Sequence, residues 1–271
     1  MSAKLPRYWA HLKSPDFARL DAARTVAVLP VAATEQHGPH LPLSVDTDLL
    51  EGVLAHSLPH LPSEAPVLIL PTQSVGRSIE HESFAGTLSV DSAALIGHWL
   101  DLGCSVARAG LKKLVLLNSH GGNVSTLDIV GRELRARHGL TVLMVHTFSL
   151  KLPTEVQALF PPEEHRFGAH GGDIETSMML ALHPERVDMA LAQNFASSSQ
   201  QRAQHYPVLG DGQSAKLAWA VQDLNPLGAA GNAAAATADK GRAVLQASAQ
   251  VLARLLTEAC ALAPMEAGGG R

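Results

Sequence analysis

Short apolar runs alternate with amphipathic stretches along the first half of the chain. The apolar runs are short enough, and uniform enough, to be strands buried on both faces; they lie at residues 25–31, 65–71, 114–117 and 141–147. The stretches between them place leucine and valine at helical spacing, at residues 47–58, 91–109 and 123–137. Strands that alternate with helices are typical of a parallel sheet. The pattern therefore predicts an α/β fold with a mostly parallel central sheet and helices on both faces.

The remaining segments are less regular. Residues 1–24 are amphipathic and predict one or two short helices, whereas residues 187–215 are polar and lack a clear period. A last helix with an apolar stripe is expected over 233–262, and the glycine-rich tail at 265–271 is expected to be disordered.

The amino-acid composition limits the classes of protein to which this chain can belong. The chain has 271 residues, of which 46% are hydrophobic and 17% charged, as in a globular protein with one large α/β domain or two small ones. A net charge of −4 without a long basic run gives nucleic-acid binding little support. No segment resembles a signal peptide or reaches membrane-spanning length. Cys104 and Cys260 belong to no paired motif, so we expect a reducing cytoplasm and no disulfide framework.

The segment Glu35 to Asp46, which follows the first strand, carries several carboxylate and imidazole side chains. Glu35 and His37 would face the same side of an extended chain, and Gly38 with the prolines at 39 and 42 could turn Asp46 back toward them. Mixed carboxylate and imidazole ligands suit Zn²⁺, Mn²⁺ or Fe²⁺. The alternative interpretation is a polar loop with incidental histidines.

Two further segments carry similar side chains at strand or helix ends. His120 follows the third strand directly, at the sheet edge where functional groups of open α/β sheets collect. His170 and Glu175 flank the start of a helix, where a carboxylate is also favoured by the helix dipole alone. If these segments converge with Glu35 to Asp46, their side chains could hold two metal ions. The ions would lower the pKa of bound water and so supply hydroxide near neutral pH. His170 could then pass a proton to a leaving nitrogen.

Four motifs in this order resemble the creatininase (creatinine amidohydrolase) superfamily. They span much of residues 25–245 and read Glu35-Gln-His-Gly-Pro-His-Leu-Pro with Asp46, Phe84-Ala-Gly-Thr, Asn118-Ser-His-Gly-Gly-Asn and His170-Gly-Gly-Asp-Ile-Glu-Thr-Ser. The resemblance implies a single α/β domain over residues 1–271, two divalent metal ions and assembly as a homohexamer.

The resemblance also implies roles for individual residues. Four of them, Glu35, His37, Asp46 and His120, resemble metal ligands of the family, with Asp46 as the bridge between two ions. Glu175 resembles a further carboxylate ligand, and His170 the catalytic histidine. Arg77, Glu80 and His81, in a long loop, are candidate substrate contacts or partners of the ligands, whereas His40 and Asp48 are expected to support the site or the fold.

Three departures distinguish this chain from creatininase itself. Gly122 and Ala169 stand where creatininase has glutamates, and its two substrate-enclosing tryptophans have no counterpart, with Phe148 and Arg166 in their neighbourhoods. The tryptophans of this chain (Trp9, Trp99 and Trp219) all lie away from the motifs in the sequence. We therefore expect a family member other than creatininase.

The sequence thus predicts a metal-dependent amidohydrolase that cleaves a non-peptide C–N bond of a small, cyclic or open amide. A small-peptide hydrolase on the same site and a non-catalytic metal-binding protein are the alternatives. A nucleotide-binding Rossmann domain is disfavoured because EQHG, and not G-x-G-x-x-G, follows the first strand.

Overall fold

A four-stranded parallel sheet forms the centre of the molecule. The computed structural model describes residues 6–266. The strands have the order β2-β1-β3-β4, and their bounds are β1 Val26–Val31, β2 Val67–Ile69, β3 Lys113–Asn118 and β4 Thr141–His146. In register, β1 ends at Val31 opposite Asn118, and Asn118 lies opposite His146. The three longest strands therefore end at one edge of the sheet. The predicted strands and their parallel arrangement are confirmed.

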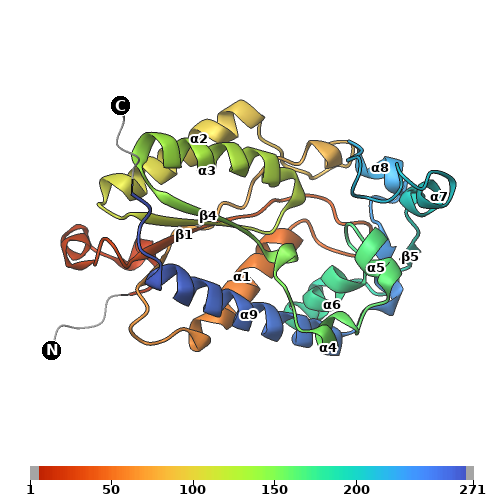
Figure 1. Cartoon of the computed structure of the whole chain (residues 1–271). Helices are drawn as coiled ribbons and strands as arrows, with labels where there is room; N and C mark the ends of the chain where they lie inside the picture. Colours follow the sequence, from red (N-terminus) through yellow and green to blue (C-terminus); the bar gives the residue numbers. More distant parts are fainter. Residues whose placement is uncertain (1–5, 267–271) are drawn as a thin grey trace.

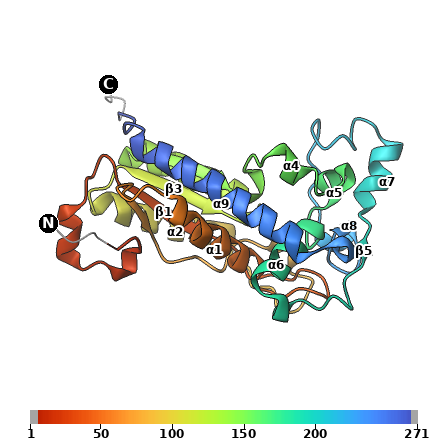
Figure 2. The ribbon, with the colours of Figure 1, turned by 90° about the horizontal axis from the view of Figure 1, so that it is seen from below.

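Helices cover both faces of the sheet (Figure 1). One face packs against α2 and α3, and the other against α1 and α9 (Figure 2). The bounds of these helices are α1 Val45–Ser57, α2 Ser92–Arg108, α3 Val124–His138 and α9 Ala238–Ala261. Strand β1 shows why its apolar run is continuous: Val26 and Val28 belong to the α1/α9 core, whereas Ala27 and Leu29 belong to the α2/α3 core. Burial on both faces leaves no polar position within such a strand.

The remaining elements gather beyond the carboxyl ends of the strands (Figures 1 and 2). They are α4 Thr154–Gln157, α5 Pro162–Phe167, α6 Asp173–Leu182, α7 Ser198–His205, α8 Val221–Leu224 and the antiparallel pair β5 Asn194–Phe195 and β6 Gly231–Asn232. Short 3-10 helices complete the described chain: Trp9–His11, Ser14–Arg19, Leu58–His60, Ile79–His81, Gly121–Asn123, Thr147–Ser149, Pro184–Arg186 and Ala233–Ala235.

Sequence and structure differ mainly outside the sheet. The segment 187–215, which has no clear period, contains β5 and α7. The sequence pattern does not reveal them because β5 buries only Phe195 and α7 buries no residue. The last helix begins at Ala238 and not at 233. Residues 267–271 of the tail that we expect to be disordered lie outside the described part of the chain. Among the described helices, none is long and apolar enough to cross a membrane.

The start of α9 is fixed against α6. The Thr237 amide donates to Ser177 Oγ at 3.0 Å, and Lys240 Nζ donates to Asp173 Oδ2 at 2.7 Å. Gly241 makes the crossing possible, since a Cβ there would lie 1.8 Å from the carbonyl oxygen of Ser177. Helix α6 carries Glu175, so this crossing also positions a predicted metal ligand.

Candidate metal centre

Side chains from four separate segments meet at the carboxyl ends of β1 and β3. They form three overlapping groups, and within each group the donor atoms all lie within 4.8 Å of one another. We call these six residues the donor cluster: Glu35, His37, Asp46, His120, His170 and Glu175. The structure therefore brings together every predicted ligand and the predicted catalytic histidine.

Local hydrogen bonds bring the first two segments together. Gly38 turns the chain after His37 with φ 74°. The Glu35 amide donates to the Leu43 carbonyl at 3.0 Å, which closes the loop. Ser119 Oγ then donates to the Asp46 carbonyl at 2.9 Å and joins the start of α1 to the end of β3. The turn expected from glycine and proline thus places Asp46 beside Glu35.

One ring nitrogen of His37 carries no proton, and that nitrogen faces two carboxylates. Its Nδ1 lies 3.1 Å from the Glu35 carbonyl oxygen and must donate to it. Burial lowers the pKa of His37 to about 4, so Nε2 carries a lone pair at neutral pH. That nitrogen is 3.8 Å from Asp46 Oδ1 and 3.9 Å from Glu175 Oε2. A lone pair facing two carboxylate oxygens is costly unless a metal ion lies between them or one carboxyl carries a proton.

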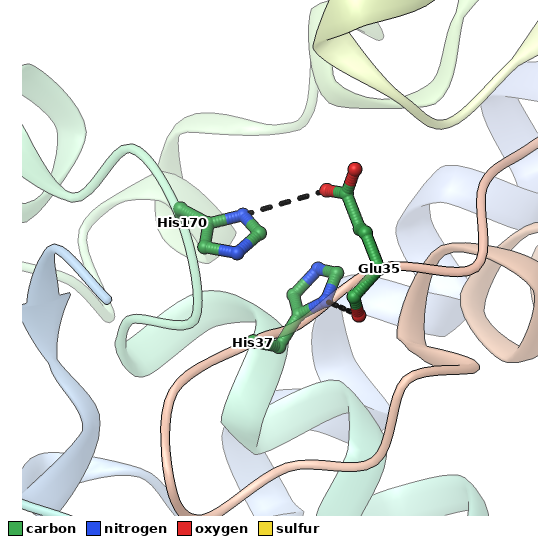
Figure 3. Close-up of side chains that lie close together, drawn as sticks. All are labelled: Glu35, His37 and His170. Atoms are coloured by element: carbon green, nitrogen blue, oxygen red, sulfur yellow. Dashed lines mark hydrogen bonds and ion pairs between the residues drawn. The ribbon is translucent and has the colours of Figure 1, made fainter. Parts of the chain in front are cut away.

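His170 lies beside His37 and has a similar arrangement (Figure 3). Its Nε2 donates to the Gln36 carbonyl at 2.6 Å. Burial, and then the neighbouring His37, lower the pKa of His170 to about 4. The neutral ring therefore presents the Nδ1 lone pair toward Glu35 Oε1, 3.8 Å away. His170 is placed to accept a proton at Nδ1 or to bind an ion there.

His120 lies among three carboxylates. Asn118 holds its backbone in place, and His120 Nε2 donates to the Arg77 carbonyl at 2.7 Å. Its Nδ1 is 3.4 Å from Asp46 Oδ2, and its Nε2 is 3.3 Å from Glu35 Oε2. Burial opposes the charged form, but Glu35, Asp46 and Glu80 outweigh it and raise the pKa of His120 to about 10. The pocket thus favours a positive charge at this point.

The carboxylates of the donor cluster also favour a nearby positive charge. Burial and the Glu35 charge raise the pKa of Asp46 well above its usual value, and burial raises the pKa of Glu175. Three deeply buried atoms, Glu35 Oε2, His37 Nε2 and Asp46 Oδ2, form no hydrogen bond among the described residues, although His120 lies within ion-pair distance of the two oxygens. Such buried atoms are costly unless paired or bound to a metal. The donor set of carboxylate oxygens and imidazole nitrogens fits Zn²⁺, Mn²⁺ or Fe²⁺.

The long loop at residues 74–89 lies beside the donor cluster, although not all of its predicted contacts face it. His81 Nε2 is 3.3 Å from Glu35 Oε1, and Glu80 Oε1 is 3.7 Å from His120 Nε2. The guanidinium group of Arg77 instead contacts Ser89, the Val90 carbonyl and Glu82. The part of Arg77 that reaches the cluster is its carbonyl oxygen.

The sequence of this chain also matches a known protein family. A family model described as "Creatininase: Creatinine amidohydrolase" matches residues 10–256.

The chain belongs to the creatininase family.

Sequence relatives within the creatininase family carry two different names. One is "Creatinine amidohydrolase" of Pseudomonas putida, 35% identical over 187 residues, which are 64% of this chain and 70% of the relative. Another is "Mycofactocin precursor peptide peptidase" of Mycobacterium ulcerans, 34% identical over 231 residues, 80% of this chain and 78% of the relative. Membership in the family supports a metal-dependent amidohydrolase, and these names divide between non-peptide and peptide bonds.

Solved creatininase structures share the fold. A structure titled "Creatininase Mn" has a TM-score of 0.74 and 28% identity, and the match covers 93% of this chain and 98% of that chain. A creatininase variant described as Zn-Zn type has a TM-score of 0.74 at 27% identity, covering 94% and 98%. A structure named as a creatinine amidohydrolase from Bacteroides fragilis shares the fold alone, with a TM-score of 0.77 at 20% identity over 97% of this chain and 100% of that chain. The α/β fold with its covered parallel sheet is therefore the creatininase fold.

The sequence does not predict the roles of two residues near the cluster, Gln36 and Trp219. Gln36 Nε2 donates to His81 Nδ1 at 2.8 Å and to the Gly228 carbonyl at 2.9 Å, which directs the His81 Nε2–H toward Glu35. Trp219 also lies close to the loop at residues 74–89, since its ring centroid is 6.5 Å from that of His81. Trp219 is distant from every motif in sequence, and an irregular segment brings it there. Only a three-dimensional arrangement could reveal it.

Metal loading should raise the melting temperature. The apo protein keeps unpaired buried donors, and an ion that binds only the folded state adds stability by mass action. At a free concentration of Zn²⁺ or Mn²⁺ a hundredfold above Kd, we expect a rise of about 5–10 °C, measured by calorimetry before and after chelation. Glu175→Gln should reduce this rise without lowering the melting temperature of the chelated protein by more than a few degrees. Equal melting temperatures with and without metal would contradict a metal site here.

Proposed function

We propose that this creatininase-family protein is a metal-dependent amidohydrolase that cleaves a non-peptide C–N bond of a small amide, with cyclic amides as the first candidates. The observation that carries the proposal is the set of lone pairs on His37 and His170 that face carboxylates inside a buried cluster. We further infer that Glu35, His37, Asp46, His120 and Glu175 hold two divalent ions and that the protein forms a homo-oligomer, as the family resemblance implies. A cytoplasmic location is inferred from the two cysteines, which belong to no paired motif.

Bound divalent ions would lower the pKa of water and polarise a substrate carbonyl. The protein itself fixes the donors: Asp46 directs its two oxygens toward His37 and His120, which suits it to lie between two ions. Burial of these side chains excludes bulk water and strengthens every charge interaction at the site.

His170 is proposed to move the proton. Its Nε2–H is held by the Gln36 carbonyl, so Nδ1 can accept a proton from water and pass it to the departing nitrogen. Glu35 Oε1, 3.8 Å from that nitrogen, would stabilise the imidazolium while it exists. The ring is also held by its neighbours, since its centroid lies 4.0 Å from that of His37 and 4.2 Å from that of His81.

A screen of substrates tests the proposal. Metal-loaded protein would be challenged with cyclic amides, open-chain amides and dipeptides, and product formation followed by mass spectrometry. We expect hydrolysis of a cyclic or open-chain amide, its loss on chelation, and a fall in kcat of about a hundredfold or more in His170→Asn. His56→Asn, which changes an exposed histidine, is the control. Hydrolysis of dipeptides alone would favour the peptidase function that the mycobacterial relative's name states, and no hydrolysis at all would overturn both.

A further inference from the structure

A cavity of about 230 Å³ lies beside the donor cluster, between α5, α7 and the irregular segment before α8. Trp219 forms part of its wall, and Ala169, the residue before His170, forms another part. The ring of Trp219 also faces the edge of His81, whose Nε2 is 3.3 Å from Glu35. Trp219 therefore links the wall of this cavity to His81, which in turn faces Glu35 of the donor cluster.

The charge of this cavity is positive. Its lining includes Arg166, Arg202 and Lys216 but a single carboxylate, Asp211. Arg166 donates to the Gly210 carbonyl and lies close enough to Asp211 to help lower the pKa of that carboxyl. Arg202 donates to Ser198 Oγ at 3.3 Å, and neither Arg202 nor Lys216 forms an ion pair with a carboxylate among the described residues. Arg202, which is half-buried, and Lys216, which is exposed, thus line this cavity without a paired carboxylate.

We infer that this cavity receives an anionic group of the substrate, and that the preferred substrates are amides carrying a carboxylate a few bonds from the scissile C–N bond. Charge-assisted hydrogen bonds from arginine and lysine recognise carboxylates, and the cavity has space for roughly seven waters at the volume each occupies in the liquid. That space is sufficient for a carboxylate on a short stem. This inference rests on the proposed amidohydrolase function, because it assigns the scissile bond to the donor cluster.

A pair of isosteric probes tests the charge preference. Hydantoin-5-acetic acid and hydantoin-5-acetamide present the same cyclic amide, and differ only in a carboxylate against a carboxamide. With metal-loaded protein, we expect kcat/KM to be about tenfold or more higher for the acid, mainly through a lower KM. Arg202→Gln and Lys216→Gln should each remove most of this preference. Lys151→Gln, which removes an exposed cation absent from the cavity lining, should keep it.

Binding measured by calorimetry separates the subsite from the reaction. If neither probe is hydrolysed but the acid binds more tightly than the amide, and Arg202→Gln or Lys216→Gln abolishes the difference, the anion subsite stands while this reaction fails. If hydrolysis occurs with equal kcat/KM for acid and amide, the amidohydrolase function stands and the anion subsite is overturned. Equal binding of the two probes without hydrolysis also overturns the subsite. Because Lys216 makes no hydrogen bond or ion pair in the described structure, its variant should fold as the parent does.

Discussion

Replacing Asp46 with asparagine is expected to remove most of the bound metal and to lower kcat/KM by about a thousandfold, which corresponds to about 4 kcal/mol of transition-state stabilisation. Asp46 is the carboxylate that faces two imidazoles, with Oδ1 3.8 Å from His37 Nε2 and Oδ2 3.4 Å from His120 Nδ1. Asparagine keeps the shape but loses the charge and one acceptor oxygen. Elemental analysis should find about two equivalents of metal in the parent protein and less than half of that in the variant.

Asp48→Asn is the matched control for this measurement. Asp48 lies on the same helix, but its carboxylate accepts from Ser44 Oγ and pairs with Arg186 outside the donor cluster. We expect its metal content and kcat/KM to stay within about twofold of the parent values, because exposed ion pairs contribute little. An Asp46→Asn protein that keeps its full metal content and activity would rule out Asp46 as a bridging ligand.

Gly241→Ala should destabilise the protein by about 3 kcal/mol or more, at the upper end of the cost of overpacking. The added Cβ would lie 1.8 Å from the Ser177 carbonyl oxygen and 2.8 Å from the Met178 amide nitrogen. Both are backbone atoms of α6, so no rotamer change can relieve the clash, and the two helices must separate. Denaturant unfolding measures the loss. Because α6 carries Glu175, metal affinity should fall in the same variant.

Gly97→Ala separates this clash from the effect of helix propensity. Gly97 lies in the exposed part of α2, and a Cβ there meets no atom within 4 Å. The same substitution should therefore stabilise the protein by up to about 1 kcal/mol, the ordinary advantage of alanine over glycine in a helix. Similar effects at the two glycines would show that the α6–α9 crossing tolerates separation.

The sheet could be predicted from the sequence because both of its faces are covered. Strands buried on two sides are apolar along most of their length, and this makes runs such as 114–117 visible without any structure. Short elements outside the sheet carry no such signal. Strand β5, for example, consists of Asn194 and Phe195, of which only Phe195 is buried.

The donor cluster could also be predicted, for a related reason. Parallel strands end at one edge, so Glu35 after β1 and His120 after β3 must lie near each other once the strand order is known. The partners that orient the cluster could not be predicted in this way. Gln36 reads as an ordinary loop residue, and its link to Gly228 depends on two segments far apart in the sequence.

The packing of α9 on α6 has a consequence for the order in which the molecule is made. Synthesis reaches Glu35 early, but the helix that fixes Glu175 begins at Ala238. While a nascent chain lacks α9, the crossing at Gly241 does not exist and the ends of α6 are unsupported. Glu175 is then not yet fixed relative to the other members of the donor cluster. Selective metal uptake is therefore expected to follow translation of α9, and a ribosome-stalled chain that ends before residue 238 should bind metal loosely and without the same preference.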